Sequence, residues 1–573
     1  MLFYTVLAVS LYVIVFVIGL LMGANVKDWA EFTKLAAGVV GMAICITLIA
    51  FLIRWILRNL RKALFGLACL ATLIALFYVE ENVRGKWAWN HFKSEWEAKG
   101  ANFDIAAFVP PSVPDDQNFA MTPVAASMYD WIIDKNGHEI TPHPTNAHPG
   151  LQLKTYHDDD ANTPTNGYWA MGTLTDLRAW QTYLRTPRTN AAGATLTNEF
   201  PTAAQPQTPA EDVLLALSKY DSTIEQLREA SRMPESRFPL EYDKDNPAMI
   251  LLPHLAQINR TVQFLTLRSI AELQAGEAEK SAADVNLMLY LIQSVHNEPI
   301  LISHLVRIRL LNFALQPIYE GLVAHKWTDA QLAEFEAKLA EFNFPADYSL
   351  SIRGEAALTS KVIDYLQRTR KVSPMRNIND GQNDQWMDRV CAVIPGGWFH
   401  QNQVGFARFY LEQCLPVVNV ENREFSPKAA GHAQAVLEKL VAHSRPYNAL
   451  LYIFLSPVKR WLFDKDVAAN RFAFGQTSAD LARVAIALER HRLAYGQYPE
   501  SLAALAPQFI DKLPHDVIGG GELKYRLTNG GFVLYSIGWN EKDDGGTPAP
   551  MKNNFLDPDS DAGDWVWRSV TKN

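Results

Sequence analysis

The segment at 539–547 concentrates oxygen-bearing side chains and backbone freedom within a few positions. Asn540, Asp543 and Asp544 supply amide and carboxylate oxygens, and the two glycines that follow let the backbone turn its carbonyl groups inward. Ca²⁺ takes about six to eight oxygen ligands, including carbonyls from irregular backbone. The segment therefore predicts a calcium loop. The alternative interpretation is a solvated acidic turn that holds no ion.

Other residues with catalytic or metal-binding chemistry form no recognisable constellation. Two Ser-x-x-Lys sequences, at 456–459 and 569–572, lack the partner motifs of serine hydrolases, and no GxSxG, HExxH or P-loop pattern occurs. A loop-rich stretch holds histidines and acids whose spacing matches no helix or strand ligand pair: His138, His143, His148, His157 and Asp158 to Asp160. Four charged residues either line a polar cleft or pair with one another at helix packing faces: Arg307, Arg309, Arg353 and Glu355. We therefore assign no catalytic residue from the sequence.

Composition bounds the class of protein. The chain has 573 residues, of which 48% are hydrophobic and 20% charged, so it can bury large cores over about three or four domains. Its net charge of −8 argues against binding nucleic acid, because phosphate binding requires a basic surface.

Three charge-free segments, at 2–24, 35–53 and 63–79, have the length and composition of transmembrane helices. They predict a three-helix membrane anchor over residues 1–80, with a buried hairpin of a soluble domain as the alternative. The loop before the third segment is rich in basic residues: Arg54, Arg58, Arg61 and Lys62. The positive-inside rule places this loop and the N-terminus in the cytoplasm, and everything after residue 80 outside it, in the periplasm of a bacterium.

The rest of the chain divides by pattern into three parts. Residues 81–207 are rich in Pro, Thr and Asn and predict extended chain with short helices. Residues 208–469 carry apolar residues at helical spacing, and predict an all-α bundle or solenoid-like domain. Capping boxes at Thr208 and Thr328 mark two of its helix starts. Residues 470–573 predict a helix ending at Gly496, a short helix and a hairpin turning at 529–530, a small α+β domain.

The last part resembles the head domain of the major pseudopilins of type II secretion. The matching motifs are G-x-YP at 496–499, LP-x-D at 513–516, S-x-G at 536–538 and the glycine pair at 545–546. The resemblance covers about 475–567 and implies a calcium loop closed by a later aspartate, for which Asp564 stands in position. Asn540 occupies the place where that family usually has its first aspartate. The chain lacks the prepilin cleavage site of a fibre subunit, and its remainder resembles bacterial membrane-anchored proteins.

Cys391 and Cys414 lie in the soluble part, and an extracytoplasmic location would allow a disulfide between them. Taken together, the patterns predict a membrane-anchored extracytoplasmic scaffold or binding protein of the bacterial cell envelope, related to secretion or pili. Its expected partners are the lipid bilayer and other envelope proteins, with no nucleic acid, and its expected cofactor is calcium. The alternative is a cell-envelope hydrolase whose site is assembled from residues distant in the sequence.

Overall fold

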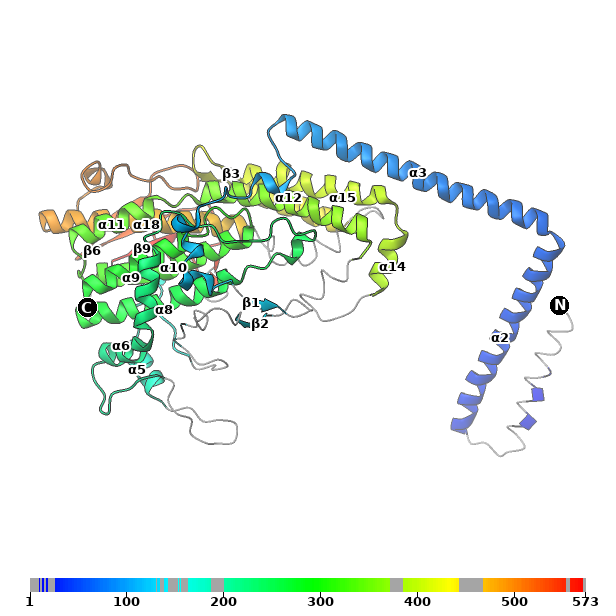
Figure 1. Ribbon diagram of the computed structural model, residues 1–573, viewed down its shortest axis with the longest axis horizontal. Coiled ribbons are helices and arrows are strands. Elements are labelled where there is room, and N and C mark those ends of the chain that lie inside the picture. Colours follow the sequence, from blue (N-terminus) through cyan, green and yellow to red (C-terminus); the bar gives the residue numbers. More distant parts are fainter. Residues whose placement is uncertain are drawn as a thin grey trace. The chain divides into compact units, whose positions relative to one another are not determined.

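The computed structural model of the chain (Figure 1) describes residues 26–129, 131–133, 139–142, 163–186, 200–371, 385–442, 467–552 and 557–569, with a few isolated residues elsewhere. The chain divides into two compact units, Met1–Val83 and Arg84–Asn573. The described chain is mainly helical, with a few small antiparallel sheets.

The first unit holds the helix α2 (Val26–Arg58) and the first turns of α3 (Leu60–Ala98). Among the described residues, α3 is the one helix long and apolar enough to cross a membrane, and the apolar part of α2 is the shorter Ile44–Trp55. A span needs about 20 apolar residues, so of the two expected spans that fall within the described residues, at 35–53 and 63–79, the structure supports the one at 63–79. The first expected span, at 2–24, lies almost wholly outside the described residues.

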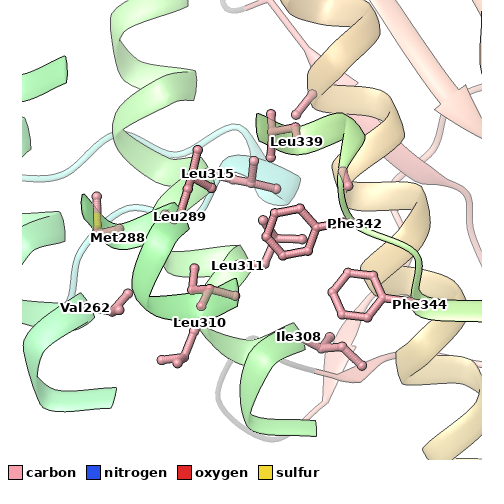
Figure 2. Close-up of a cluster of buried hydrophobic side chains, with 14 of the residues drawn as sticks. Val262, Met288, Leu289, Ile308, Leu310, Leu311, Leu315, Leu339, Phe342 and Phe344 are labelled. Carbon is pink, nitrogen blue, oxygen red and sulfur yellow. The ribbon is translucent and has the colours of Figure 1, made fainter. Parts of the chain in front are cut away.

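The core of the second unit is built from long helices packed around α10 (Leu301–Val323). This helix contacts α8 (Pro253–Ala275), α9 (Ala278–Gln293), α12 (Phe344–Thr369) and α18 (Val467–Tyr495). Figure 2 shows the apolar side chains that α10 contributes, with Leu310, Leu311 and Leu315 facing residues of the neighbouring helices. These leucines of α10 are buried at the centre of the unit. Burial of apolar surface is the dominant favourable contribution to folding.

Local sequence signals set several helix ends as expected. Both capping boxes form: the Thr208 hydroxyl and Glu211 cap α6 (Pro209–Leu217), and Thr328 and Gln331 cap α11 (Asp329–Ala340). The helix α18 ends at Tyr495, and Gly496 follows in the left-handed conformation with φ of 78°.

The remaining α-helices of the described residues are α4 (Pro123–Ala126), α5 (Leu177–Arg185), α7 (Asp221–Ala230), α14 (Gln385–Val393), α15 (Gly396–Arg408) and α16 (Pro427–Ala442), with a π-helix at Phe409–Cys414.

The main sheet lies in the C-terminal part and is antiparallel, in the order β5 (Lys524–Thr528), β6 (Gly531–Ser536), β9 (Trp565–Arg568). Thr528 pairs with Gly531 across the predicted hairpin turn, which confirms the hairpin. Three two-stranded sheets pair β1 (Trp131–Ile133) with β2 (Glu139–Pro142), β3 (Val418–Asn419) with β4 (Glu424–Phe425), and β7 (Met551–Lys552) with β8 (Asp557–Pro558).

Residues from all three predicted soluble segments share one core. Trp169, from the loop-rich segment, is fully buried and lies 6.2 Å from the Phe474 ring of α18 and 5.0 Å from the Trp567 ring of β9. The helix α18 in turn packs against α10, α11 and α12 on one side and against β6 and β9 on another. The predicted boundaries at 207 and 469 therefore fall inside the second compact unit.

Candidate functional site

The acidic loop follows β6 and is closed by Asp564, the residue before β9. One carboxylate oxygen of Asp564 accepts a hydrogen bond from the Asp544 N–H at 3.2 Å, and the other accepts one from the Gly546 N–H at 2.6 Å. The backbone supports the same closure, since the Asp564 N–H donates to the Thr547 carbonyl at 2.8 Å. Asp564 thus lies against the 539–547 segment, the place that the resemblance implied for it.

The other three predicted ligands take part in hydrogen bonds within the loop. Asp544 Oδ2 accepts from the Asn540 side-chain amide and from the Gly563 N–H, both at 2.9 Å. Asp543 Oδ1 accepts from the Gly545 N–H and from the Tyr535 hydroxyl, both at 3.0 Å. Each carboxylate keeps its second oxygen, Asp543 Oδ2 and Asp544 Oδ1, without a hydrogen bond from the described part of the chain.

The loop as it stands is therefore held by peptide N–H donors to carboxylate oxygens. No group of three His, Cys, Asp or Glu side chains is arranged to hold a metal ion in the described ranges. Burial raises the pKa of Asp564, and the neighbouring N–H groups of Asp544 and Gly546 act against that shift. The glycines fit the turn: Gly545 and Gly546 have φ of 68° and 78°, where other residues are strained.

The LP-x-D and S-x-G motifs meet in the structure. Asp516 is buried, and its carboxylate accepts hydrogen bonds from the Ser536 hydroxyl at 2.8 Å and from the Ile518 and Ile537 N–H groups at 3.0 Å. Burial raises the pKa of Asp516, while these three donors lower it. This aspartate joins the loop at 512–520 to the end of β6. Its role is structural, which explains why two motifs about twenty residues apart occur together.

A cavity of about 670 Å³ lies beside this loop, and the sequence did not reveal it. It is bounded by the β3–β4 turn, by α18 and by the loop at 512–520. The Phe425 N–H donates to the Val517 carbonyl at 2.8 Å, which holds two of these walls together. The lining is mainly polar and carries both signs of charge: Glu421, Asn422, Arg423, Glu424, Asp480, Arg483, Lys512, Leu513, Pro514, His515, Val517 and Gly520.

The charges at the cavity fall into a paired set and an unpaired set. Arg483 bonds to Glu336 at 2.9 Å and to Asp480 at 3.4 Å, so these three residues compensate one another. Asp480 is buried, and burial raises its pKa. Lys512 and Glu421, by contrast, are exposed and form no ion pair with the described residues. The walls come from positions far apart in the sequence, and no local motif connects them.

Arg423 stands at the rim of the same cavity in an unusual backbone conformation. Its φ is 54°, in the left-handed region that costs a residue with a Cβ of order 1 kcal/mol or more. Its guanidinium donates to the Phe342 carbonyl at 3.2 Å. The turn therefore holds this arginine against the main helical core.

Two of the four charged residues that the sequence left open as a cleft, Arg307 and Glu355, serve helix packing instead, while Arg309 and Arg353 are exposed. Arg307 is buried and donates to Asp347 at 2.6 Å and to the Ile292 carbonyl at 3.1 Å. The Glu355 carboxylate accepts from the Leu301 N–H at 3.1 Å and so caps the first turn of α10. Arg309 lies over the Phe313 ring at 5.6 Å. Burial lowers the pKa of His304, next to Arg307, to about 4, so this imidazole is neutral near pH 7.

A second buried network joins α7, α8 and α9. Asp284 is fully buried and accepts from Arg228 and, at 3.1 Å, from Arg268. Burial and the nearby Asp284 raise the pKa of Glu272 to about 8. Charges in this network face one another inside the bundle, and none of them lines the cavity described above.

The other residues that the sequence singled out are the loop histidines, the Ser-x-x-Lys sequences and the two cysteines of the soluble part. The four histidines and the Ser-x-x-Lys at 456–459 lie outside the described residues. Cys391 and Cys414 are buried and free, so the disulfide between them is not formed. Burial raises the pKa of Cys391 to about 11 and raises that of Cys414 further.

Comparison of the chain with protein-family models, with curated proteins and with solved structures finds no match.

Proposed function

We propose that the chain is a membrane-anchored binding protein of the bacterial cell envelope, with its folded unit outside the cytoplasm. The main support for this proposal is that α3 combines a candidate membrane span with residues that pack into the second unit. Its first half is apolar and exposed, and its last turns belong to the second unit, where Trp89 and Phe92 pack with Phe103, Val404, Ala407 and Leu411. The candidate span and the first packed residues of the folded unit therefore belong to one helix, Leu60–Ala98.

The orientation of α3 follows from its flanking charges. Arg54, Arg58, Arg61 and Lys62 precede its charge-free part, and this dense basic cluster favours the cytoplasmic side. This orientation requires only α3 as a span. It predicts that residues after about 80 lie outside the cytoplasm.

The cavity supports binding as the activity of the folded unit. Lys512 and Arg423 offer positive charge, while Glu421 and Glu424 offer negative charge around the same space. A ligand with both signs of charge, such as a segment of polypeptide, matches that lining. The hydrolase alternative would take its acid from Asp480, whose two oxygens already accept from Gln476 at 3.0 Å and Arg483 at 3.4 Å, and we therefore favour binding.

The resemblance of the tail to pseudopilin heads supports a place among secretion- or pilus-related envelope proteins. We further propose that Ca²⁺ binds the acidic loop from outside, through Asp543 Oδ2 and Asp544 Oδ1, because these oxygens remain available after the loop has closed. Water would supply most of the other ligands.

Alkaline phosphatase fused after Gln207 tests the anchoring and the orientation together, since Gln207 is exposed. This reporter folds only outside the cytoplasm, so we expect an active fusion that stays with membranes through alkaline carbonate extraction. A cytoplasm-dependent reporter that works at the same position would contradict the orientation. Release of the chain by carbonate would contradict the span.

A further inference from the structure

At the cavity beside the loop at 512–520, one set of charges compensates itself. Arg483 pairs with Glu336 at 2.9 Å and with Asp480 at 3.4 Å. Burial raises the pKa of Asp480, while the Arg423 and Arg483 guanidinium groups act against that shift, so both lie near this carboxylate. Two guanidinium groups therefore face two carboxylates, and this set needs no charged ligand.

A second set of charges in the lining has no such partners. Glu421 and Glu424 belong to the β3–β4 hairpin, and Lys512 stands on the loop at 512–520. None of these three side chains forms an ion pair or a hydrogen bond with the described part of the chain. His515 also lines the cavity, but its Nε2 atom is buried. The unpaired lining therefore offers two carboxylates against one ammonium group, and a matching ligand carries a surplus of positive charge.

The β3–β4 hairpin is braced against the loop at 512–520 before any ligand arrives. The Phe425 N–H donates to the Val517 carbonyl at 2.8 Å and joins the two segments. A Cβ added at Gly520 would lie 2.4 Å from Glu424 Oε1, so this glycine leaves the space that the carboxylate occupies. Binding at such a site costs little ordering of the protein, which favours affinity.

The apolar part of the lining narrows the kind of cation. Leu513, Pro514 and Val517 bound the same space as the free carboxylates. Lysine and arginine side chains carry their charge on an aliphatic stem that packs along apolar surface. A metal ion or a small amine lacks that stem and makes no use of these three residues. The lining therefore fits a basic side chain.

The remaining charge and the size of the cavity indicate that this side chain belongs to a polypeptide. Lys512 can pair with a carboxylate, and a polypeptide presents basic and acidic side chains close together along its length. The volume of about 670 Å³ lies within the range of ligand sites, about 300–1,000 Å³, which suits a few residues rather than a folded domain. A purely anionic ligand such as inorganic phosphate meets Glu421 and Glu424, which repel it.

We propose that the cavity binds a basic residue of a polypeptide segment, with its charged group at Glu421 and Glu424 and a neighbouring carboxylate of the segment at Lys512. This inference rests on the proposed function, because it names the class of ligand for the binding site proposed there. It also gives the ligand a polarity, since its cation lies at the β3–β4 hairpin and its anion at the loop that follows residue 511.

Binding of short peptides to the full chain in a non-ionic detergent tests this assignment. The probes are capped hexapeptides of alanine with one lysine and one aspartate, made in both orders and labelled with a neutral fluorophore. Matched peptides replace the lysine by glutamine, the aspartate by asparagine, or both. Fluorescence anisotropy measures each Kd. We expect the lysine–aspartate peptide, in its better order, to bind roughly threefold to tenfold more tightly than either singly substituted peptide, and the neutral peptide to bind most weakly.

Variants of the lining assign the two contacts. In a chain with Glu421→Gln and Glu424→Gln, replacing the peptide lysine by glutamine should no longer change the Kd, because the partners of the lysine are gone. In Lys512→Gln, replacing the peptide aspartate by asparagine should likewise have no effect. Glu229→Gln on α7 and Lys280→Gln on α9 remove exposed charges outside the cavity and should keep the preferences of the parent chain.

The peptide series on the unaltered chain decides the matter even where a variant unfolds. Equal affinity for charged and neutral peptides overturns the basic residue and leaves the cavity as a site for polypeptide of another composition. Tightest binding of the peptide that keeps the aspartate alone overturns it as well, and so does the absence of binding by every peptide at millimolar concentration. Release of the chain from membranes by carbonate instead contradicts the proposed function, whatever the peptides do.

Discussion

Three carboxylates in the described part of the chain, two of them buried and that of Glu355 partly buried, act as acceptors for backbone N–H groups. Asp516, Glu355 and Asp564 each accept at least one such bond, and burial raises the pKa of each. A carboxylate is well suited to the task because it offers two oxygens and several lone pairs. The cost is desolvation of the charge, and this cost depends on pH.

Glu355 gives the clearest pH prediction. Burial raises its pKa from an ordinary 4.5 to about 7 in the folded chain. Between these values the folded state holds a proton that the unfolded state has lost, so stability falls as pH rises through this window and stays lower above it. Glu355→Gln keeps an oxygen for the Leu301 N–H and removes the charge. We expect the variant to be more stable than the parent at pH 8, by on the order of 3 kcal/mol at most, and little different near pH 4.5.

Urea unfolding of the full chain in detergent, followed at both pH values, measures the effect. Glu334→Gln serves as the control, because Glu334 is an exposed residue of α11. Equal midpoints for Glu355→Gln and the parent at pH 8 would mean that the carboxylate is not destabilising in its ionised form.

At the scale of elements, α10 binds a loop through a polar stripe inside the core. Asn312, Gln316 and Glu320 repeat every four residues and so share one face of the helix. The Asn312 side-chain oxygen accepts from the Trp169 indole N–H at 3.2 Å, and Glu320 accepts from the Thr175 N–H at 2.9 Å. The segment at 167–176 is thereby fixed to α10 without being a regular element.

Trp169→Ala should consequently destabilise the whole second unit. The indole is fully buried between the rings of Phe474 and Trp567, and removing a buried tryptophan costs about 3–5 kcal/mol. Met171→Ala in the same segment should cost much less, because Met171 is 43% exposed. Urea midpoints of the two variants and the parent decide the matter. Similar losses for both variants would contradict the anchoring role of Trp169.

The acidic loop between β6 and β9 carries the calcium prediction. Binding to the folded state alone stabilises by RT ln(1 + [L]/Kd), about 2.7 kcal/mol at a hundredfold excess over Kd. The full chain in detergent should then melt higher in millimolar calcium than in chelator. Asp543→Asn with Asp544→Asn should abolish the difference, and Asp511→Asn, an exposed site outside the loop, should retain it.

Asp564 must be kept in that experiment, because its two N–H bonds close the loop with or without an ion. Asp564→Ala should therefore lower the melting temperature in both buffers. Identical melting of the parent chain in calcium and in chelator would leave the loop as an acidic turn closed by peptide N–H groups.

Elements with a local cause were predictable from the sequence. Thr208 and Thr328 fixed two helix starts through their capping boxes, and Gly496 fixed a helix end through its left-handed conformation. Features that depend on tertiary packing were missed. Trp169 reads as part of a proline- and threonine-rich surface segment, yet it is fully buried by residues three hundred or more positions away. The cavity was missed for the same reason, because Arg423, Arg483 and Lys512 are far apart in the sequence and come together only in the fold.

At the scale of the whole molecule, the second unit should fold as one cooperative body. The helix α18 is the reason, because it packs against α10, α11 and α12 and also carries β6 and β9. Its residues Phe472, Leu481 and Leu488 are fully buried, so removing α18 would expose a long apolar surface on the bundle. Separate folding of the helical part and of the tail would require this shared surface to be solvated.

We therefore expect a single unfolding transition for residues 84–573, coincident by tryptophan fluorescence and by circular dichroism. Deletion of 467–573 should abolish that transition and leave an aggregating chain, because the buried faces of α10 and α11 lose their cover. Deletion of 570–573, which lies beyond β9, provides the control and should leave the transition unchanged. Two resolved transitions, or a folded and monomeric chain ending at residue 466, would show that the tail is an independent domain appended to the helical body.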